Sequence, residues 1–118
     1  MKRSRVVLVA AVALVPLAVP RSVQAANGEF LYTTVADRTQ SVRHRSLKEP
    51  ENGRCHILNT APSENRVIRE QNKTDVPATV FAGNNCTGQT GTIAVGATQN
   101  SCDGGTPCWE SVRFLPPA

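Results

Sequence analysis

The amino-acid sequence predicts a small all-β domain, and three observations lead to this fold class. Short apolar or alternating runs recur along the chain, and turn signals rich in Gly, Pro, Asn and Asp separate them at intervals of about ten residues. No long amphipathic helical pattern is visible. Four cysteines accompany a chain of modest length, so disulfides are expected to supplement a small core. Together these features indicate a β-sandwich or a small barrel.

The first 25 residues have the three-part pattern of a secretory signal peptide. Basic residues open the segment, an apolar run follows over residues 6–19, and small residues allow cleavage after Ala25. The apolar run is shorter than the roughly 20 residues that a membrane span needs. We therefore expect residues 26–118 to form one secreted, extracellular domain that has no membrane contact after cleavage.

Removal of this segment changes the charge balance of the chain. The precursor contains 13 basic and 9 acidic residues, and four of the basic residues but none of the acidic ones lie in residues 1–25. Nine residues of each sign remain in the mature chain. The positive charge of the precursor is therefore no argument for nucleic-acid binding, and we expect no nucleic-acid partner.

Four cysteines in an exported chain predict two disulfides. Three connectivities are possible, and we favour Cys102–Cys108 with Cys55–Cys86. The first closes a short loop rich in Gly, and the second then links the two halves of the domain. No metal site or cofactor is expected, because the chain has no C-x-x-C pair. Cys55 and His56 are adjacent, so in a strand they would point to opposite faces.

The predicted strands follow in order along the mature chain, and they cover residues 28–35, 40–47, 54–58, 76–82, 90–95 and 110–115. Residues 66–72 hold a single apolar pair, so this segment is predicted as either a helical turn or an edge strand. Residues 59–65 and 100–107 are predicted as loops. In the last strand, alternation predicts Val112 and Phe114 inward, with Ser111 and Arg113 outward.

The hairpin over residues 78–96 carries a resemblance to a known family. The run VFAGNNCTG over residues 80–88, followed by SVRF over residues 111–114, resembles the βγ-crystallin Greek-key motif. That motif has an aromatic-containing strand, a turn folded over at a glycine, and a closing Ser-Val-Arg strand. Gly88 matches the turn glycine, whereas Cys86 stands where an aromatic residue usually lies.

The resemblance covers residues 76–115 and implies a small disulfide-stabilised Greek-key sandwich in which two motifs form one domain. Residues 28–69 lack the corresponding glycine turn. The calcium-binding members of the family have Asn or Asp shortly before the serine strand. Thr106 and Pro107 occupy those positions here, so the resemblance does not carry the calcium site over to this chain.

The sequence offers no catalytic constellation. His44 and His56 are its two histidines, neither lies in a nucleophile motif, and no G-x-S-x-G occurs. Glu49 and Glu51 flank a proline in a turn, and Glu110 has no carboxylate partner nearby in the sequence. We therefore predict no catalytic residue and no enzymatic activity, and a very small hydrolase is the least favoured function.

The loop closed by the Cys102–Cys108 disulfide is the first predicted contact surface. A disulfide orders a loop in advance, which lowers the entropy cost of binding. The residues of this predicted surface are Asp103, Gly104, Gly105, Thr106, Pro107 and Trp109.

A basic patch is the second predicted contact surface. It requires the predicted strands 40–47 and 54–58 to be neighbours, and it would suit an acidic glycan, an anionic lipid head group or an acidic protein. The residues of this predicted patch are Arg38, Arg43, Arg45, Lys48 and Arg54. The alternative is an ordinary surface on which nearby acidic residues neutralise these charges.

These observations predict a monomeric, non-enzymatic binding or inhibitor-like module whose partner is an unknown protein or glycan. A structural or stress-related protein of the extracellular space or cell envelope is the alternative.

Overall fold

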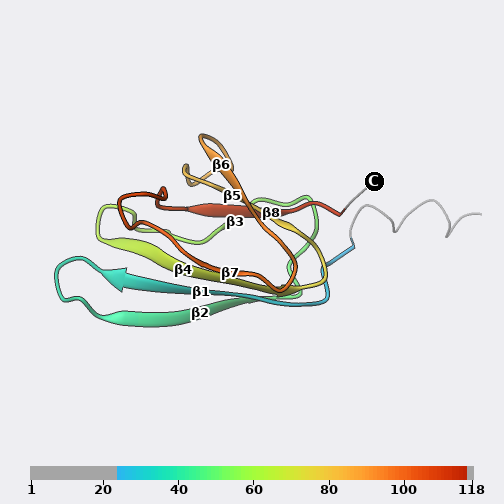
Figure 1. Ribbon diagram of the computed structural model, residues 1–118, viewed down its shortest axis with the longest axis horizontal. Helices are drawn as coiled ribbons and strands as arrows, with labels where there is room; N and C mark the ends of the chain where they lie inside the picture. The colour runs from blue at the N-terminus through green and yellow to red at the C-terminus, as the bar shows by residue number, and fades with distance from the viewer. Residues whose placement is uncertain (1–23, 117–118) are drawn as a thin grey trace, which may run out of the picture.

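The computed structural model describes residues 24–116, and this part of the chain is entirely β with no helix. One sheet contains β1 (Gly28–Ala36), β2 (Val42–Lys48), β4 (Asn65–Thr74) and β7 (Thr98–Asn100), in the order β2-β1-β4-β7. The other contains β3 (His56–Ile57), β5 (Ala78–Phe81), β6 (Thr90–Ile93) and β8 (Ser111–Phe114), in the order β3-β8-β5-β6. Figure 1 shows the two sheets as stacked layers. The all-β prediction is confirmed.

The predicted signal peptide lies outside the described residues, apart from Gln24 and Ala25. Residues 24–116 contain no helix that is long and apolar enough to cross a membrane.

The two halves of the chain follow the same order of strands. In the first half β4 returns to lie beside β1, with β2 on the other side of β1. In the second half β8 returns to β5, with β6 on its other side. The third strand of each half, β3 or β7, pairs in the sheet of the other half. All of these pairings are antiparallel, and the return of each fourth strand to the first is compatible with a Greek key.

The core lies between the two sheets and is centred on aromatic residues. Phe30 from β1 and Phe114 from β8 are fully buried, and their ring centroids lie 5.5 Å apart in an edge-to-face arrangement. Val67 of β4 and Val80 of β5 are also fully buried and complete the contact between the sheets. Burial of these side chains is the main stabilising term for a domain of this size.

Both predicted disulfides are present. Cys55 bonds to Cys86 and Cys102 bonds to Cys108. The first joins the segment before β3 to the turn between β5 and β6, so it links the two halves as predicted. The second closes the loop between β7 and β8.

The prediction that Ser111 points outward is wrong. This residue is fully buried, and its hydroxyl donates to the carbonyl oxygen of Gly83 and accepts from the Cys86 amide at 2.9 Å. Both partners lie in the turn between β5 and β6, so Ser111 ties that turn to β8. A serine can be buried here because both of its hydrogen-bonding roles are satisfied.

Residues 66–72 also differ from the prediction, because they form neither a helical turn nor an edge strand. They belong to β4, which spans ten residues and lies between β1 and β7 in the interior of its sheet. Its buried residues include the polar Glu70 and Asn72. The Asn72 amide donates to the carbonyl oxygens of Val76 at 2.9 Å and Ile93 at 3.0 Å. A strand with a partly polar buried face shows no apolar alternation in the sequence.

The other differences concern strand boundaries and one missed strand. The predicted strand over residues 54–58 is reduced to β3, a pair of residues. The strand β7 was not predicted, and its last residue, Asn100, falls in a predicted loop. The predicted basic patch requires the strands over residues 40–47 and 54–58 to be neighbours, and this condition is not met, because β2 and β3 belong to different sheets.

Gly91 makes room for the buried indole of Trp109, and its replacement by alanine is expected to destabilise the fold. A Cβ atom at Gly91 would lie 2.9 Å from Cζ2 of Trp109, which is 4% exposed. Overpacking of this kind typically costs about 1–3 kcal/mol. Chemical denaturation of G91A measures the loss. G105A is the control, because a Cβ atom there meets nothing closer than 4.0 Å; equal stability of G91A and the parent protein would contradict the prediction.

Candidate functional site

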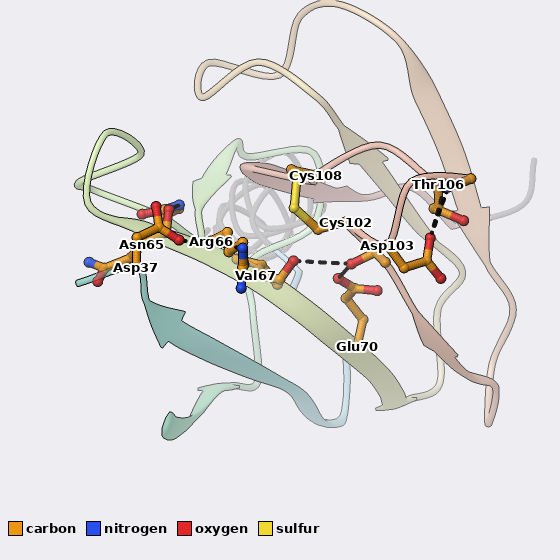
Figure 2. The surroundings of a disulfide bond; sticks show 12 residues. Asp37, Asn65, Arg66, Val67, Glu70, Cys102, Asp103, Thr106 and Cys108 are labelled. Atoms are coloured by element: carbon orange, nitrogen blue, oxygen red, sulfur yellow. Dashed lines mark hydrogen bonds and ion pairs between the residues drawn. A yellow bond between two sulfur atoms is a disulfide. The ribbon is translucent and has the colours of Figure 1, made fainter. Parts of the chain in front are cut away.

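The loop between β7 and β8, residues 102–108, is held in shape by its disulfide and by its own hydrogen bonds. The carboxylate of Asp103 accepts from the Gly105 amide at 3.2 Å and from the Thr106 amide at 3.1 Å. The Cys102 amide donates back across the loop to the Thr106 carbonyl at 3.1 Å. Figure 2 shows the Cys102–Cys108 disulfide and the Asp103–Thr106 bond. The loop is therefore ordered without a partner.

The tip of this loop faces solvent. Asp103, Gly104 and Gly105 are exposed, and Thr106 and Pro107 are partly exposed. Together with Gln89 and the two cysteines, residues 104–107 line a hollow of about 420 Å³. Five of the six predicted contact residues thus form one accessible surface.

Trp109 is not part of that surface. Its side chain is 4% exposed and belongs to the core cluster. Its burial follows from the glycine opposite it on β6, which leaves space for the indole. The prediction of Trp109 as a contact residue is therefore wrong.

A buried carboxyl group lies directly beneath the loop, and sequence reasoning missed it. Glu70 is fully buried, and the Ser101 hydroxyl lies 2.6 Å from its Oε2 atom and 3.2 Å from the Val67 carbonyl oxygen. Burial raises the pKa of Glu70 to about 7, although the side chains of Ser101 and Gln99 act in the opposite direction. Figure 2 shows Glu70 beside the base of the loop. Its sequence context, between Arg69 and Gln71, gave no signal of burial.

The structure divides the predicted basic patch. Arg43 and Arg45 lie on β2 on one face of the sheet, opposite Thr34 and Tyr32 of β1. Because they are two residues apart on a strand, these two arginines share a face. Burial raises the pKa of Tyr32, and the positive charge of Arg45 partly offsets this.

The other three residues of the predicted patch lie elsewhere. Arg38 is exposed in the turn between β1 and β2, and Lys48 ends β2 opposite Glu29. Arg54 precedes β3, and its guanidinium lies 3.6 Å from the Glu51 carboxylate. Because β2 and β3 are in different sheets, the five residues do not form the patch that the sequence predicts.

The two histidines lie in separate and unlike surroundings. His44 is exposed on β2, with Nδ1 3.2 Å from the Thr33 hydroxyl. His56 is partly buried; its Nε2 lies 3.0 Å from the Glu51 carbonyl oxygen, and its ring packs against Phe114. Within residues 24–116, no group of three or more His, Cys, Asp and Glu side chains is placed to hold a metal ion.

Comparison with known proteins adds no relative: no family model, no curated protein and no solved structure matches this chain.

Proposed function

We propose that this protein is a secreted, inhibitor-like binding module that contacts a partner protein through loop 102–108. The observation that carries the proposal is the combination of order and exposure in this loop. The Cys102–Cys108 disulfide and the hydrogen bonds of Asp103 fix its backbone, while residues 103–107 stay accessible. A loop that is already ordered loses little conformational entropy on binding, so more of the contact energy appears as affinity.

Secretion is supported by the composition of residues 1–25 and by the two disulfides. Disulfides form and persist in oxidising compartments, and all four cysteines of this chain are paired. A domain of this size also gains stability from such cross-links. The domain is proposed to act as a monomer.

A binding role is preferred over a catalytic one because of where the titratable groups lie. His44 and His56 are on different sheets, and within residues 24–116 neither has a serine or cysteine nucleophile as a hydrogen-bond partner. Glu70 has a raised pKa but is fully buried under the loop, where no substrate can reach it. General acid–base chemistry requires such a group within hydrogen-bond reach of the reacting atom.

We further propose that the domain is a double Greek key related to the βγ-crystallins. Two features support this relationship. Both halves have their fourth strand beside the first, as two similar motifs in one domain require. The serine of the closing strand, Ser111, accepts a hydrogen bond from the Cys86 amide in the turn between β5 and β6. The two parts of the chain that match the family motif, this turn and the closing strand, are therefore bonded to each other.

The binding proposal predicts that opening the loop weakens inhibition. The protein with intact disulfides is assayed against a panel of secreted peptidases, and affinity for each responsive peptidase is measured by surface plasmon resonance. We expect the variant C102A/C108A to bind at least about tenfold more weakly, since re-ordering the freed loop costs on the order of 1.4 kcal/mol or more. The variant T106A is expected to weaken binding while leaving the disulfide in place.

The control for this experiment is E64A, because Glu64 is exposed in the loop before β4 and does not line the loop hollow. Its affinity should equal that of the parent protein. No response from any peptidase in the panel, or equal affinity of the loop variants and the parent protein, would count against the proposal.

A further inference from the structure

The two sheets differ strongly in charge. The strands of the first sheet contain six basic residues (Arg43, Arg45, Lys48, Arg66, Arg69 and Lys73) and two acidic ones (Glu29 and Glu70). The strands of the second sheet contain one basic residue, Arg113, and no acidic one. Since Glu70 is fully buried, Glu29 is the acidic group of the first sheet that can act at its surface.

Three exposed arginines of this sheet have no ion-pair partner within residues 24–116: Arg69 on β4, and Arg43 and Arg45, which lie together on β2. Arg66 lies 3.5 Å from the Asp37 carboxylate, and Lys48 and Lys73 are both opposite Glu29 in the strand register. Within residues 24–116, no carboxylate oxygen lies within 4.0 Å of Arg43 or Arg45. Both residues are exposed, and they share one face of the edge strand β2.

These arginines border a polar hollow at the turn between β1 and β2, which we call the β1–β2 hollow. It has a volume of about 420 Å³, and its lining consists of Arg43, Arg45, Thr34, Thr39, Ser41 and Asn65, with Ala36 as its apolar part. The Thr39 hydroxyl donates to the Ser41 hydroxyl at 2.8 Å. Thr34, which is buried, also lines the hollow. Two cationic groups therefore stand beside three hydroxyl groups and one amide.

This combination of groups selects a particular ligand chemistry. Guanidinium groups bind carboxylate or sulfate through paired hydrogen bonds. Residues two apart on a strand have Cα atoms roughly 6.5–7 Å apart, so Arg43 and Arg45 are able to hold one anionic group between them. Hydroxyl and amide side chains exchange hydrogen bonds with ligand hydroxyls. A ligand that offers both an anionic group and many hydroxyls is an acidic saccharide.

We propose that the β1–β2 hollow is a binding site for an acidic saccharide that carries a carboxylate or a sulfate group. Arg43 and Arg45 hold the anionic group, and Thr39, Ser41 and Asn65 bind the sugar hydroxyls. The site shares no lining residue with the hollow at loop 102–108, so it stands independently of the protein partner proposed above. An acidic peptide would use the arginines but has no hydroxyl-rich surface to match the rest of the lining.

Titration calorimetry on the folded, disulfide-bonded protein tests the site with four probes: oligogalacturonate, a heparin-derived oligosaccharide, neutral malto-oligosaccharide and oligoglutamate. We expect one or both of the acidic saccharides to bind. Because oligogalacturonate carries carboxylates without sulfate, its binding shows that a carboxylate is sufficient, whereas binding of the heparin-derived oligosaccharide alone shows that a sulfate is required. The neutral saccharide should not bind. Binding should weaken as salt concentration rises, because the contact is largely electrostatic.

Matched variants separate the proposed site from a general charge effect. R43Q/R45Q should weaken binding of the acidic saccharide at least about tenfold, and S41A should weaken it several-fold without any change of charge. R54Q/K73Q removes the same charge from exposed residues outside the hollow, and it should bind like the parent protein.

Three results would overturn the proposal: no binding of either acidic saccharide, equal losses in R43Q/R45Q and R54Q/K73Q, or oligoglutamate binding as tightly as the saccharides. The last result would assign the arginines to an acidic peptide added at the edge of β2.

Discussion

Replacing Cys55 and Cys86 together by alanine is expected to lower the free energy of unfolding by about 3–4 kcal/mol. The bonded residues are 31 positions apart, so the cross-link restricts a long segment of the unfolded chain. It also joins the segment before β3 to the turn between β5 and β6, and this turn is further tied to β8 by Ser111. Loss of the disulfide therefore loosens the contact between the two halves.

Denaturant unfolding of C55A/C86A, followed by tryptophan fluorescence, measures this loss because Trp109 lies in the core. The variant C102A/C108A is the comparison. Its disulfide spans 6 positions, and the shorter loop predicts a smaller loss, roughly 2–2.5 kcal/mol. A larger loss in C102A/C108A than in C55A/C86A would show that constraint of the unfolded chain is not the main contribution.

The sequence predicted the fold class, and the favoured one of the three possible disulfide connectivities is the one present. Strands such as β5 and β8 alternate between buried apolar residues and others, because successive side chains of a strand point to opposite faces of the sheet. The residues between Cys102 and Cys108 favour a turn, and Gly104 has a positive φ of 94°. Both features are local, so they are readable from neighbouring residues.

The assignment of strands to sheets was not readable in this way. The strands β2 and β3 follow each other in the chain, yet they belong to different sheets. Long-range pairing decides the sheet to which β3 belongs. This strand pairs with β8 through His56–Val112 and Ile57–Ser111. The predicted basic patch required β2 and β3 to be neighbours in one sheet. Because they belong to different sheets, Arg54 does not join Arg43 and Arg45 in one patch.

The polar part of the core was missed for a related reason. Glu70 and Asn72 lie on the buried face of β4, where a hydropathy pattern would require apolar residues. Asn72 is accommodated because Val76 and Ile93 accept its amide hydrogens and Thr74 donates to its oxygen. Those partners come from loops and strand ends, and a sequence gives no sign that they converge. For the same reason, the sequence did not indicate that the carboxyl group of Glu70 is buried beneath loop 102–108.

Glu70 should make the protein less stable as the pH rises from about 4.5 to about 7. Its pKa in the folded protein is about 7, against an ordinary value of 4.5, so the folded state binds the proton more tightly than the unfolded state does. Below pH 4.5 the carboxyl is protonated in both states and burial carries no ionisation cost. Between pH 4.5 and about 7 that cost grows, and above pH 7 it reaches its full value, roughly 3 kcal/mol.

The hydrogen bonds around Ser101 are consistent with a proton on Glu70 at mildly acidic pH. The Ser101 hydroxyl has a single hydrogen, and both Glu70 Oε2 and the Val67 carbonyl oxygen lie within reach. When Glu70 is protonated, its own hydroxyl can donate to Ser101, which then donates to Val67. When Glu70 is ionised, Ser101 must donate to one acceptor and leave the other, and Oε1 of Glu70 has no hydrogen-bond partner among the described residues.

The variant E70Q removes the ionisation while keeping the shape of the side chain. At pH 8 we expect E70Q to be more stable than the parent protein by up to roughly 3 kcal/mol, and near pH 4.5 the two should be similar. Denaturant unfolding at both pH values measures the difference, with E64Q as a control because Glu64 is exposed. If E70Q keeps the pH dependence of the parent protein, another group is responsible for it. If E70Q is destabilised at both pH values, the amide is a poorer partner for Ser101 than the carboxyl group, and the cost of burying the charge is smaller than the pKa of Glu70 implies.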